Sequence, residues 1–423
     1  MHGQLSHKMQ KERSRALLIF SLATGFVLFQ FLLQFTAGIL TENLMRDFTM
    51  GAIGASVLTS AYYYTYMIMQ TPAGYLTDRY GARKLLIFSA SLTTLACLLF
   101  ALSPNAALAI IARLIMGFGV SFVFVCTLFL CRNWFPSHMY PFLVALVEAI
   151  GLLGMVFANA YTASLITHVG WHSFAYACVA ISLIFTILVP CFIRNTPKRG
   201  LGQLPLDRIK PSAHFHKDVI KLFTNFRAVC NGLYAGALMT PQTVFIASWG
   251  IPFLVSSHKL NLTQAAISSS FIFLGTAIAA PFFGWFYNYC KKPRFILALM
   301  ALLTAALYCV VIFVVKLDYL WLCLVFFLIG ITSNVYLWNY TLIHELEPRV
   351  AASTRIGFTN TLGIGVAPVL QLILGFVLHN VAHTHHIGSI HYAVRDYQWA
   401  LSLLPILCVA CAVLILFCKY KEA

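Results

Sequence analysis

Sixty per cent of the 423 residues are apolar and only nine per cent are charged, whereas a soluble domain carries about 25 per cent charged residues. This composition excludes an ordinary soluble fold and predicts an all-α protein that crosses a membrane several times. The formal net charge of +16 would suggest nucleic acid binding in a soluble protein. Here the cations fall in short loops between apolar runs, so we interpret them as topology signals and expect no nucleic acid partner.

The chain begins with a basic segment, residues 1–15, and continues through twelve apolar runs. The first run is too long for a cleaved signal peptide, so we interpret it as a retained span. Each run exceeds the ~17–20 residues that are needed to cross the hydrocarbon layer. The predicted spans are residues 16–41, 52–76, 84–102, 106–130, 141–166, 173–193, 228–255, 264–288, 295–315, 319–342, 356–379 and 397–418.

A short charged turn appears twice, which indicates that the chain consists of two similar halves. The first copy starts at Gly74, and a degenerate second copy starts at Gly284, where Asn288 occupies the position of Asp78. Between the halves lies a polar, basic and proline-containing segment that reads as a linker. We therefore predict an N-terminal six-helix bundle, a cytoplasmic linker and a C-terminal six-helix bundle at residues 1–193, 194–227 and 228–423.

The loop cations fix the expected orientation. Of the 28 Lys and Arg residues, 23 fall at the termini, in the linker and in the loops on one side, four fall on the other side, and Arg113 lies within a span. Because cytoplasmic loops carry the excess of cations, we expect both termini and the linker in the cytoplasm. The expected location is the inner membrane of a bacterium.

The first turn motif identifies a family resemblance. Its residues Gly74, Leu76, Asp78, Arg79, Gly81, Arg83 and Lys84 resemble the signature loop of the major facilitator superfamily, in the same place between spans 2 and 3. Arg113, Gly117 and Gly119 in span 4 and Gly170, Trp171 and His172 before span 6 are similar to further motifs of the family. The resemblance implies twelve transmembrane helices in two pseudo-symmetric bundles, each a pair of inverted three-helix units, and a transport function.

Three stretches resemble a narrower branch, the phagosomal nutrient transporters of intracellular bacteria and the lysosomal dipeptide carriers. They are Phe29–Phe48, Tyr62–Lys84 and the Trp249, Pro252, Phe253 and Leu254 cluster. Known members of this branch carry amino acids, nucleosides or small peptides. Span 5 contains Gly151 and Gly154 but lacks the Gly-Pro pattern of drug/proton antiporters, which disfavours an exporter.

The signature loop also has an electrostatic interpretation. A carboxylate such as that of Asp78 can pair with a cation or lie against the positive N-terminus of another helix. Such a contact would form in one conformational state and break in the other. The resemblance implies a conformational latch built from Gly74, Asp78, Arg79, Gly81, Arg83, Lys84 and Gly117. The alternative is a solvated loop that only sets topology, although topology alone would leave Asp78 unexplained.

Two ionisable side chains, Arg113 and Glu148, lie within predicted spans, and charges at such depths point to function. Counting about 1.5 Å per residue puts them within roughly 7 Å of each other along the membrane normal. They could bind the carboxylate and the ammonium of a zwitterion, with Glu148 carrying a coupling proton. They could also pair with each other, functionally or only structurally.

Other polar and aromatic side chains in the spans complete the candidate set. The resemblance implies that spans 1, 4, 7 and 10 line the central cavity, and single members of the set could equally serve helix packing. The remaining candidates for contact with solute or protons are Gln30, Gln34, Tyr62, Tyr66, Asn159, Gln242, Trp249, Asn334, Asn339, Asn360 and Gln371.

Five histidines, namely His379, His383, His385, His386 and His391, lie near the loop between the last two spans. They could capture a transition metal or respond to acid, but their spacing matches no closed site, so we predict a solvated loop and no metal. The sequence contains no P-loop and no hydrolase motif, and we predict no cofactor and no enzyme activity.

The sequence therefore predicts a monomeric secondary carrier that imports a small polar or zwitterionic solute (amino acid, dipeptide or nucleoside class), with protons as the expected co-substrate. The alternatives are a siderophore or drug exporter of the same superfamily and a non-transporting membrane receptor. An intact latch motif favours a working carrier, because a receptor need not change between two states.

Overall fold

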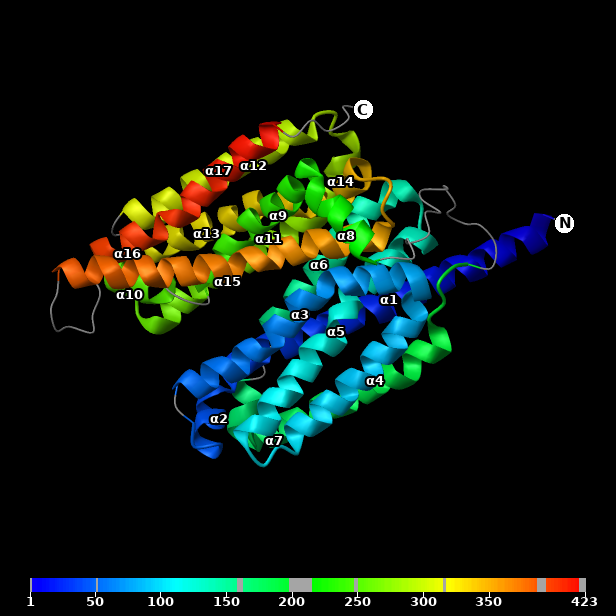
Figure 1. Ribbon diagram of the computed structural model, residues 1–423, viewed down its shortest axis with the longest axis horizontal. Helices are drawn as coiled ribbons and strands as arrows, with labels where there is room; N and C mark the ends of the chain where they lie inside the picture. Colours follow the sequence, from blue (N-terminus) through cyan, green and yellow to red (C-terminus); the bar gives the residue numbers. More distant parts are fainter. Residues whose placement is uncertain are drawn as a thin grey trace. The chain divides into compact units, whose positions relative to one another are not determined.

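The computed structural model describes residues 2–50, 52–157, 163–197, 215–246, 250–314, 317–385 and 393–417. Every regular element among these residues is a helix, in agreement with the predicted all-α class (Figure 1). The α-helices of the first half are α1 (His2–Ile39), α2 (Thr41–Asp47), α3 (Ala52–Tyr80), α4 (Ala82–Ala101), α5 (Ala106–Trp134), α6 (Tyr140–Phe157) and α7 (Ala163–Phe192). Those that follow are α8 (Phe215–Thr224), α9 (Phe226–Val244), α10 (Gly250–His258), α11 (Leu262–Phe286), α12 (Pro293–Phe313), α13 (Tyr319–Ser333), α14 (Asn339–Leu346), α15 (Ala352–His385), α16 (Val394–Leu401) and α17 (Leu403–Phe417).

Ten helical segments of the described chain are long and apolar enough to cross a membrane. The other two predicted spans, 52–76 and 228–255, coincide with α3 and with the pair α9 and α10. Large apolar side chains such as Leu320, Leu372 and Phe376 are more than two-thirds exposed. Side chains of this kind in contact with water would be costly, so the helices are suited to a hydrocarbon environment.

The chain divides into two compact units. Unit 1 comprises Met1–Lys221 together with Pro348–Phe358, and unit 2 comprises Leu222–Glu347 together with Thr359–Ala423. The first turns of α15 therefore belong to unit 1, while the rest of this helix belongs to unit 2. Pro348–Phe358 is thus a segment of the second half of the sequence that belongs to unit 1.

Unit 1 is held together by close helix pairs, above all α3 with α5 and α4 with both α5 and α7 (Figure 1). Glycine makes the first of these pairs possible. A Cβ atom at Gly117 on α5 would collide with the main-chain oxygen of Tyr62 on α3. Small residues at such crossings let two backbones approach, which provides packing where no hydrophobic effect acts between helices.

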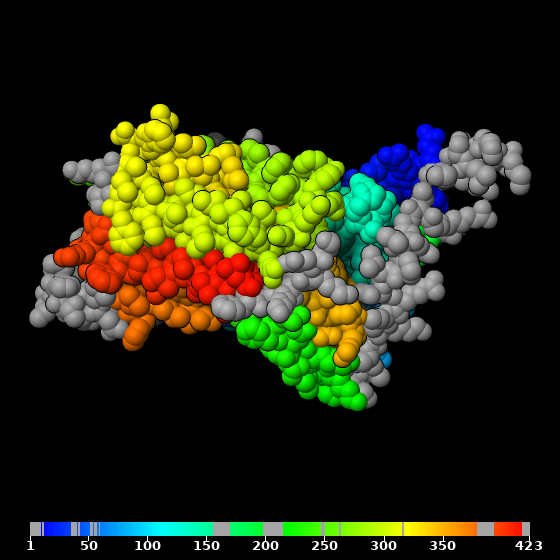
Figure 2. Space-filling model, turned by 90° about the horizontal axis from the view of Figure 1, so that it is seen from above, coloured from blue at the N-terminus to red at the C-terminus, as the bar shows by residue number. Residues whose placement is uncertain are grey.

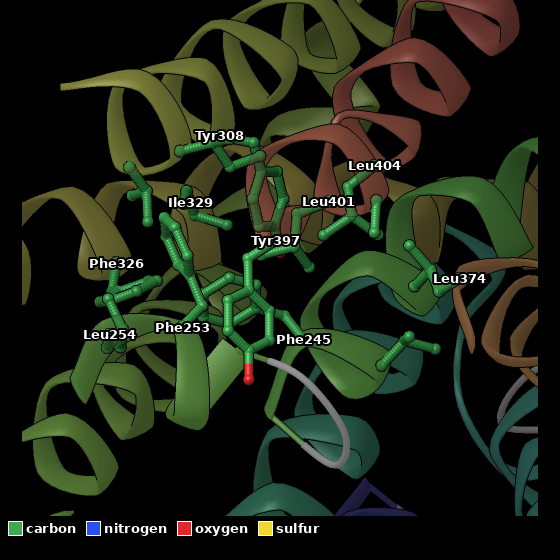
Figure 3. Packing of buried hydrophobic residues seen from close by; sticks show 14 of the residues in the cluster. Phe245, Phe253, Leu254, Tyr308, Phe326, Ile329, Leu374, Tyr397, Leu401 and Leu404 are labelled. Carbon is green, nitrogen blue, oxygen red and sulfur yellow. The ribbon is translucent and has the colours of Figure 1, made fainter. Parts of the chain in front are cut away.

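Unit 2 has a dense apolar core built from α9 to α13 and from α15 to α17 (Figure 3). Phe245 packs at ring-centroid distances of 6.1 Å from Tyr308 and 5.5 Å from Phe326. Tyr397 on α16 closes the same cluster against Phe253. On the outside of this unit, α12 and α17 lie alongside one another (Figure 2).

Three predicted spans of the second half are not single helices. The span 228–255 is divided into α9 and α10, and the span 319–342 is interrupted by the 3₁₀ segment η5 (Asn334–Trp338). The span 397–418 breaks at Ser402, between α16 and α17. Pro405 accounts for the last break, since proline supplies no N–H for a bond to Leu401. Hydropathy reports only the apolar length, so it could not reveal these breaks.

Candidate functional site

A buried polar cluster joins α1 to α3 in unit 1, and it contains three of the predicted site residues. The Gln30 side chain is fully buried, and its amide nitrogen donates to the Tyr66 hydroxyl over 2.8 Å. The Tyr62 hydroxyl donates to the main-chain oxygen of Gln30, and the two tyrosine rings stack with centroids 5.8 Å apart. One helical turn further along α1, Gln34 hydrogen-bonds to Tyr63. The amide oxygen of Gln30 has no partner among the described residues.

Arg113 adjoins this cluster from α5. Its side chain is 3% exposed, and its Nη1 donates to the main-chain oxygen of Leu33 over 2.8 Å. The guanidinium carbon lies 4.8 Å from the centre of the Tyr62 ring, which is a cation–π contact. The sulfur of Met116, 3.6 Å away, is a weak acceptor. The groups that stabilise the guanidinium charge are thus the Leu33 carbonyl, the Tyr62 ring and the Met116 thioether.

Glu148, the second ionisable residue, is buried on α6 with 8% of its surface exposed. No carboxylate is among the contacts of Arg113 in the described part of unit 1. The zwitterion site formed jointly by Arg113 and Glu148 therefore stays a prediction. Asn159, the next polar residue expected on this span, lies outside the described residues.

Unit 2 contains a second polar cluster, centred on Thr276 of α11. The Thr276 hydroxyl donates to the Gln242 side-chain oxygen on α9 over 3.3 Å. Its main-chain oxygen accepts from the Asn334 amide at 3.0 Å. Gln242 and Asn334 were both predicted site residues, whereas Thr276 was missed because a single threonine in an apolar run carries no sequence signal. The Asn334 amide oxygen has no partner among the described residues.

The other predicted residues of unit 2 lie near the interrupted helix. Asn339 follows η5 and donates to the main-chain oxygen of Tyr336, while its own main-chain oxygen accepts from Asn231. The Tyr340 hydroxyl donates to Asn360 over 2.7 Å. Gln371 is exposed on α15, and Trp249 lies outside the described residues. A 3₁₀ segment within a span often marks a hinge, so η5 puts Asn334 and Asn339 at a break in the helix.

The signature-loop carboxylate caps the N-terminus of α15 within unit 1. Asp78 accepts three hydrogen bonds: from the main-chain N–H of Ser353 at 3.0 Å, from that of Thr354 at 2.7 Å and from the Thr354 hydroxyl at 2.9 Å. The N–H groups of a first helical turn lack partners inside the helix, and the helix dipole is positive there. Of the two pairings considered for Asp78, this is the contact with a helix N-terminus.

Two glycines bring the same helices close together. A Cβ at Gly74 on α3 would collide with the main-chain oxygen of Ser353, and one at Gly357 on α15 would collide with that of Gln70. The two backbones thus approach closely over the turns of α3 that precede Asp78. Only glycine permits this approach, which explains Gly74 in the motif.

The remaining motif residues build the turn between α3 and α4. Gly81 has φ +81°, a conformation that favours glycine, and it lies beside Asn195. The Asn195 side chain accepts from the main-chain N–H of Arg83 at 2.8 Å, and Arg83 Nη2 donates to Pro190 over 2.8 Å. Arg79 and Lys84 are exposed. The turn is therefore fixed to the end of α7, a long-range contact that the motif alone does not reveal.

A contact between α2 and the kink of α7 was not expected from the sequence. The Trp171 indole N–H donates to the Asp47 carboxylate over 2.6 Å, directly after Gly170, whose φ of +78° marks the kink. Asp47 also lies 3.2 Å from Arg46. The Trp171 hydrogen bond, followed by the one from Arg46, lowers the pKa of Asp47 below its usual 3.8.

The sequence model of the protein family called Major Facilitator Superfamily matches residues 22–368 of this chain. This chain belongs to the major facilitator superfamily. Its fold agrees with a solved member of the superfamily, the Escherichia coli fucose:proton symporter FucP, with a TM-score of 0.66 over 94% of this chain and 99% of that chain. At 16% identity this likeness concerns the fold alone.

Proteins similar to this chain in sequence carry names that refer to different functions. It is 24% identical over 154 residues to probable anion transporter 7 of Oryza sativa subsp. japonica, covering 36% of this chain and 35% of that protein. It is 25% identical over 259 residues to the multidrug resistance protein MdtM of Escherichia coli strain K12, covering 60% of each chain. The matched parts thus span about a third to three-fifths of these relatives' lengths.

These comparisons support the superfamily but not the narrower phagosomal and lysosomal branch. The relatives named here are a probable anion transporter and a multidrug resistance protein. The branch resemblance therefore rests only on the sequence stretches that suggested it. The chain is a multi-pass membrane protein of a transporter family.

Proposed function

We propose that this protein is a secondary active carrier that imports a small polar or zwitterionic solute together with protons. The observation that carries the proposal is the Asp78 contact with Ser353 and Thr354. Three hydrogen bonds to a carboxylate make a strong contact, yet it joins a motif of the first half of the sequence to a span of the second. In alternating access such a contact stabilises one state and must break in the other.

In this proposal the candidate solute-binding groups of each unit, taken by itself, are the polar groups whose hydrogen-bonding capacity is not used up among the described residues. The oxygens of Gln30 in unit 1 and of Asn334 and Asn339 in unit 2 have no partner among the described residues. Each is buried, and an unpaired buried acceptor is costly unless a ligand supplies a donor. Acceptors of this kind suit the N–H and O–H groups of an amino acid, a dipeptide or a nucleoside.

Glu148 is the proposed proton carrier, because it is the buried carboxylate of a predicted span. Carboxylates within spans commonly take part in proton relays. The orientation with both termini in the cytoplasm, a bacterial inner membrane and a monomeric carrier belong to the same proposal. They rest on the distribution of the loop cations and on the family.

Uptake into proteoliposomes tests this function. The purified protein would be given a panel of radiolabelled amino acids, dipeptides and nucleosides, with and without an inward proton gradient. Accumulation of one solute class that collapses with a protonophore is the expected result. Efflux of hydrophobic cations driven by the opposite gradient would instead establish the drug exporter, for which the likeness to MdtM is the supporting observation. Binding without any flux would indicate the receptor.

A further inference from the structure

A small cavity lies inside unit 1, among α1, α4, α5 and α7. Its volume is ≈ 30 Å³, more than the ~10–15 Å³ needed for one water molecule. Most of the lining is apolar, with Leu33, Phe100 and Phe174 among its side chains. The cavity is therefore large enough for one small occupant such as a single ion.

Arg113 is the charged residue in the lining. Its Nη1 is occupied by the Leu33 carbonyl, but its Nε and Nη2 are buried and have no hydrogen-bond partner among the described residues. These two nitrogens carry three N–H groups, and unpaired donors on a buried cation cost considerably more than neutral ones. A ligand in this cavity would therefore bind best if it carried negative charge and accepted hydrogen bonds from Arg113.

Among the described residues, no acid is recorded in contact with Arg113 to compensate its charge. The groups that interact with it electrostatically are Tyr62 and Tyr63 on α3 and Cys97 on α4. Cys97 and Cys178 contribute thiols to the cavity, and a thiol is a weak donor suited to a soft anion. The described lining residues supply donors and a positive charge, and no carboxylate that could bind an ammonium group is among them.

We infer that this cavity is a binding site for one small inorganic anion of the halide class, held by the Nε and Nη2 of Arg113. Because no carboxylate is among the described lining residues, an ammonium group would have no partner there, which favours such an ion over a zwitterionic solute. The site goes beyond the proposed carrier function. It gives Arg113 a counter-ion inside unit 1, where desolvation would otherwise penalise the charge.

Equilibrium binding of radiolabelled chloride to the purified full-length protein tests the inference, with gluconate salts holding the ionic strength constant. We expect saturable binding of about one chloride per chain, displaced by bromide. Arg113→Gln should weaken it about tenfold or more, since charge-assisted hydrogen bonds are lost. Unchanged binding in Arg113→Gln, or no saturable binding in the wild type, would overturn the assignment.

A matched pair at Ala175 keeps the test valid if Arg113→Gln does not fold. Ala175 is 4% exposed and lines the cavity, so Ala175→Ile should fill the space and weaken chloride binding, while Ala175→Ser should retain it. Equal binding in both variants would contradict the site. Displacement of chloride by acetate at equal concentration, but not by bromide, would reassign the cavity to carboxylates. The assay needs no transport, so failed uptake with intact chloride binding would count only against the carrier function.

Discussion

The Asp78 carboxylate lies 2.7 Å from the main-chain nitrogen of Thr354, at the first turn of α15. Only proline would remove a main-chain donor, and it would also restrict the backbone, so the acceptor is the more useful target. Asparagine keeps the shape of the side chain but removes the charge, and hydrogen bonds to a charged group contribute about 1.5–3 kcal/mol.

Asp78→Asn should therefore slow solute uptake about tenfold, the change that corresponds to ~1.4 kcal/mol, while solute affinity changes little. Initial uptake rates in proteoliposomes and equilibrium binding in detergent measure the two quantities. Thr354→Val is the matched control, because it removes only the hydroxyl hydrogen bond and leaves both N–H donors. Wild-type uptake by Asp78→Asn would reduce the loop to a topology signal.

Glu148→Gln should mimic permanent protonation of the proposed proton carrier. We expect accumulation driven by a pH gradient to be abolished, while exchange of labelled for unlabelled solute across the membrane continues. Both are measured in the same proteoliposomes. Should the variant show wild-type, pH-dependent accumulation, Glu148 has no role in coupling, and the family assignment is unaffected.

Gly117→Ala should destabilise the protein, because the added methyl group meets the main-chain oxygen of Tyr62. Forced shifts of this kind cost about 1–3 kcal/mol. The midpoint of thermal unfolding in detergent measures the loss. Gly375→Ala on α15 is the matched control, since nothing lies within 4 Å of its added Cβ. Equal midpoints for both variants would show that α3 and α5 are not in contact at this point.

The Asp47 hydrogen bond to Trp171 should weaken in acid. The folded-state pKa of Asp47 lies below the usual 3.8, so its contribution to stability is present above about pH 4 and is lost as the pH falls through the lowered pKa. Because the Asp47 side chain is 31% exposed, we expect at most about 1 kcal/mol. Unfolding midpoints at pH 3 and pH 6 should differ less in Asp47→Asn than in the wild type. An identical difference in both would contradict the contact.

The five histidines near the last loop should be dispensable for transport. Their side chains lie outside the described residues, and the prediction rests on their spacing, which matches no closed metal site. Replacing His379, His383, His385, His386 and His391 with glutamine should leave uptake unchanged, in the presence of either zinc or a chelator. Uptake that falls in the variant, and that follows added zinc in the wild type, would establish a metal site.

Hydropathy and loop charge were enough to predict the helical class and a membrane protein, and one short motif was enough for the superfamily. These properties depend on local composition: a bilayer requires long apolar helices whatever their neighbours are. Gly74 and Gly117 lie at points where two helix backbones approach closely.

The partners of the polar residues depended on the tertiary structure. The sequence put Arg113 within reach of Glu148 by counting residues along two helices, but rotation about each helix axis decides which way a side chain points. The recorded contacts of Arg113 include the Leu33 carbonyl and the Tyr62 ring, and it also lines a small cavity. The fold also brings Asp78 to Ser353, 275 positions away, Gln242 to Thr276 and Asp47 to Trp171. Distances along the chain carry no information about such contacts, because helix rotation and packing set them.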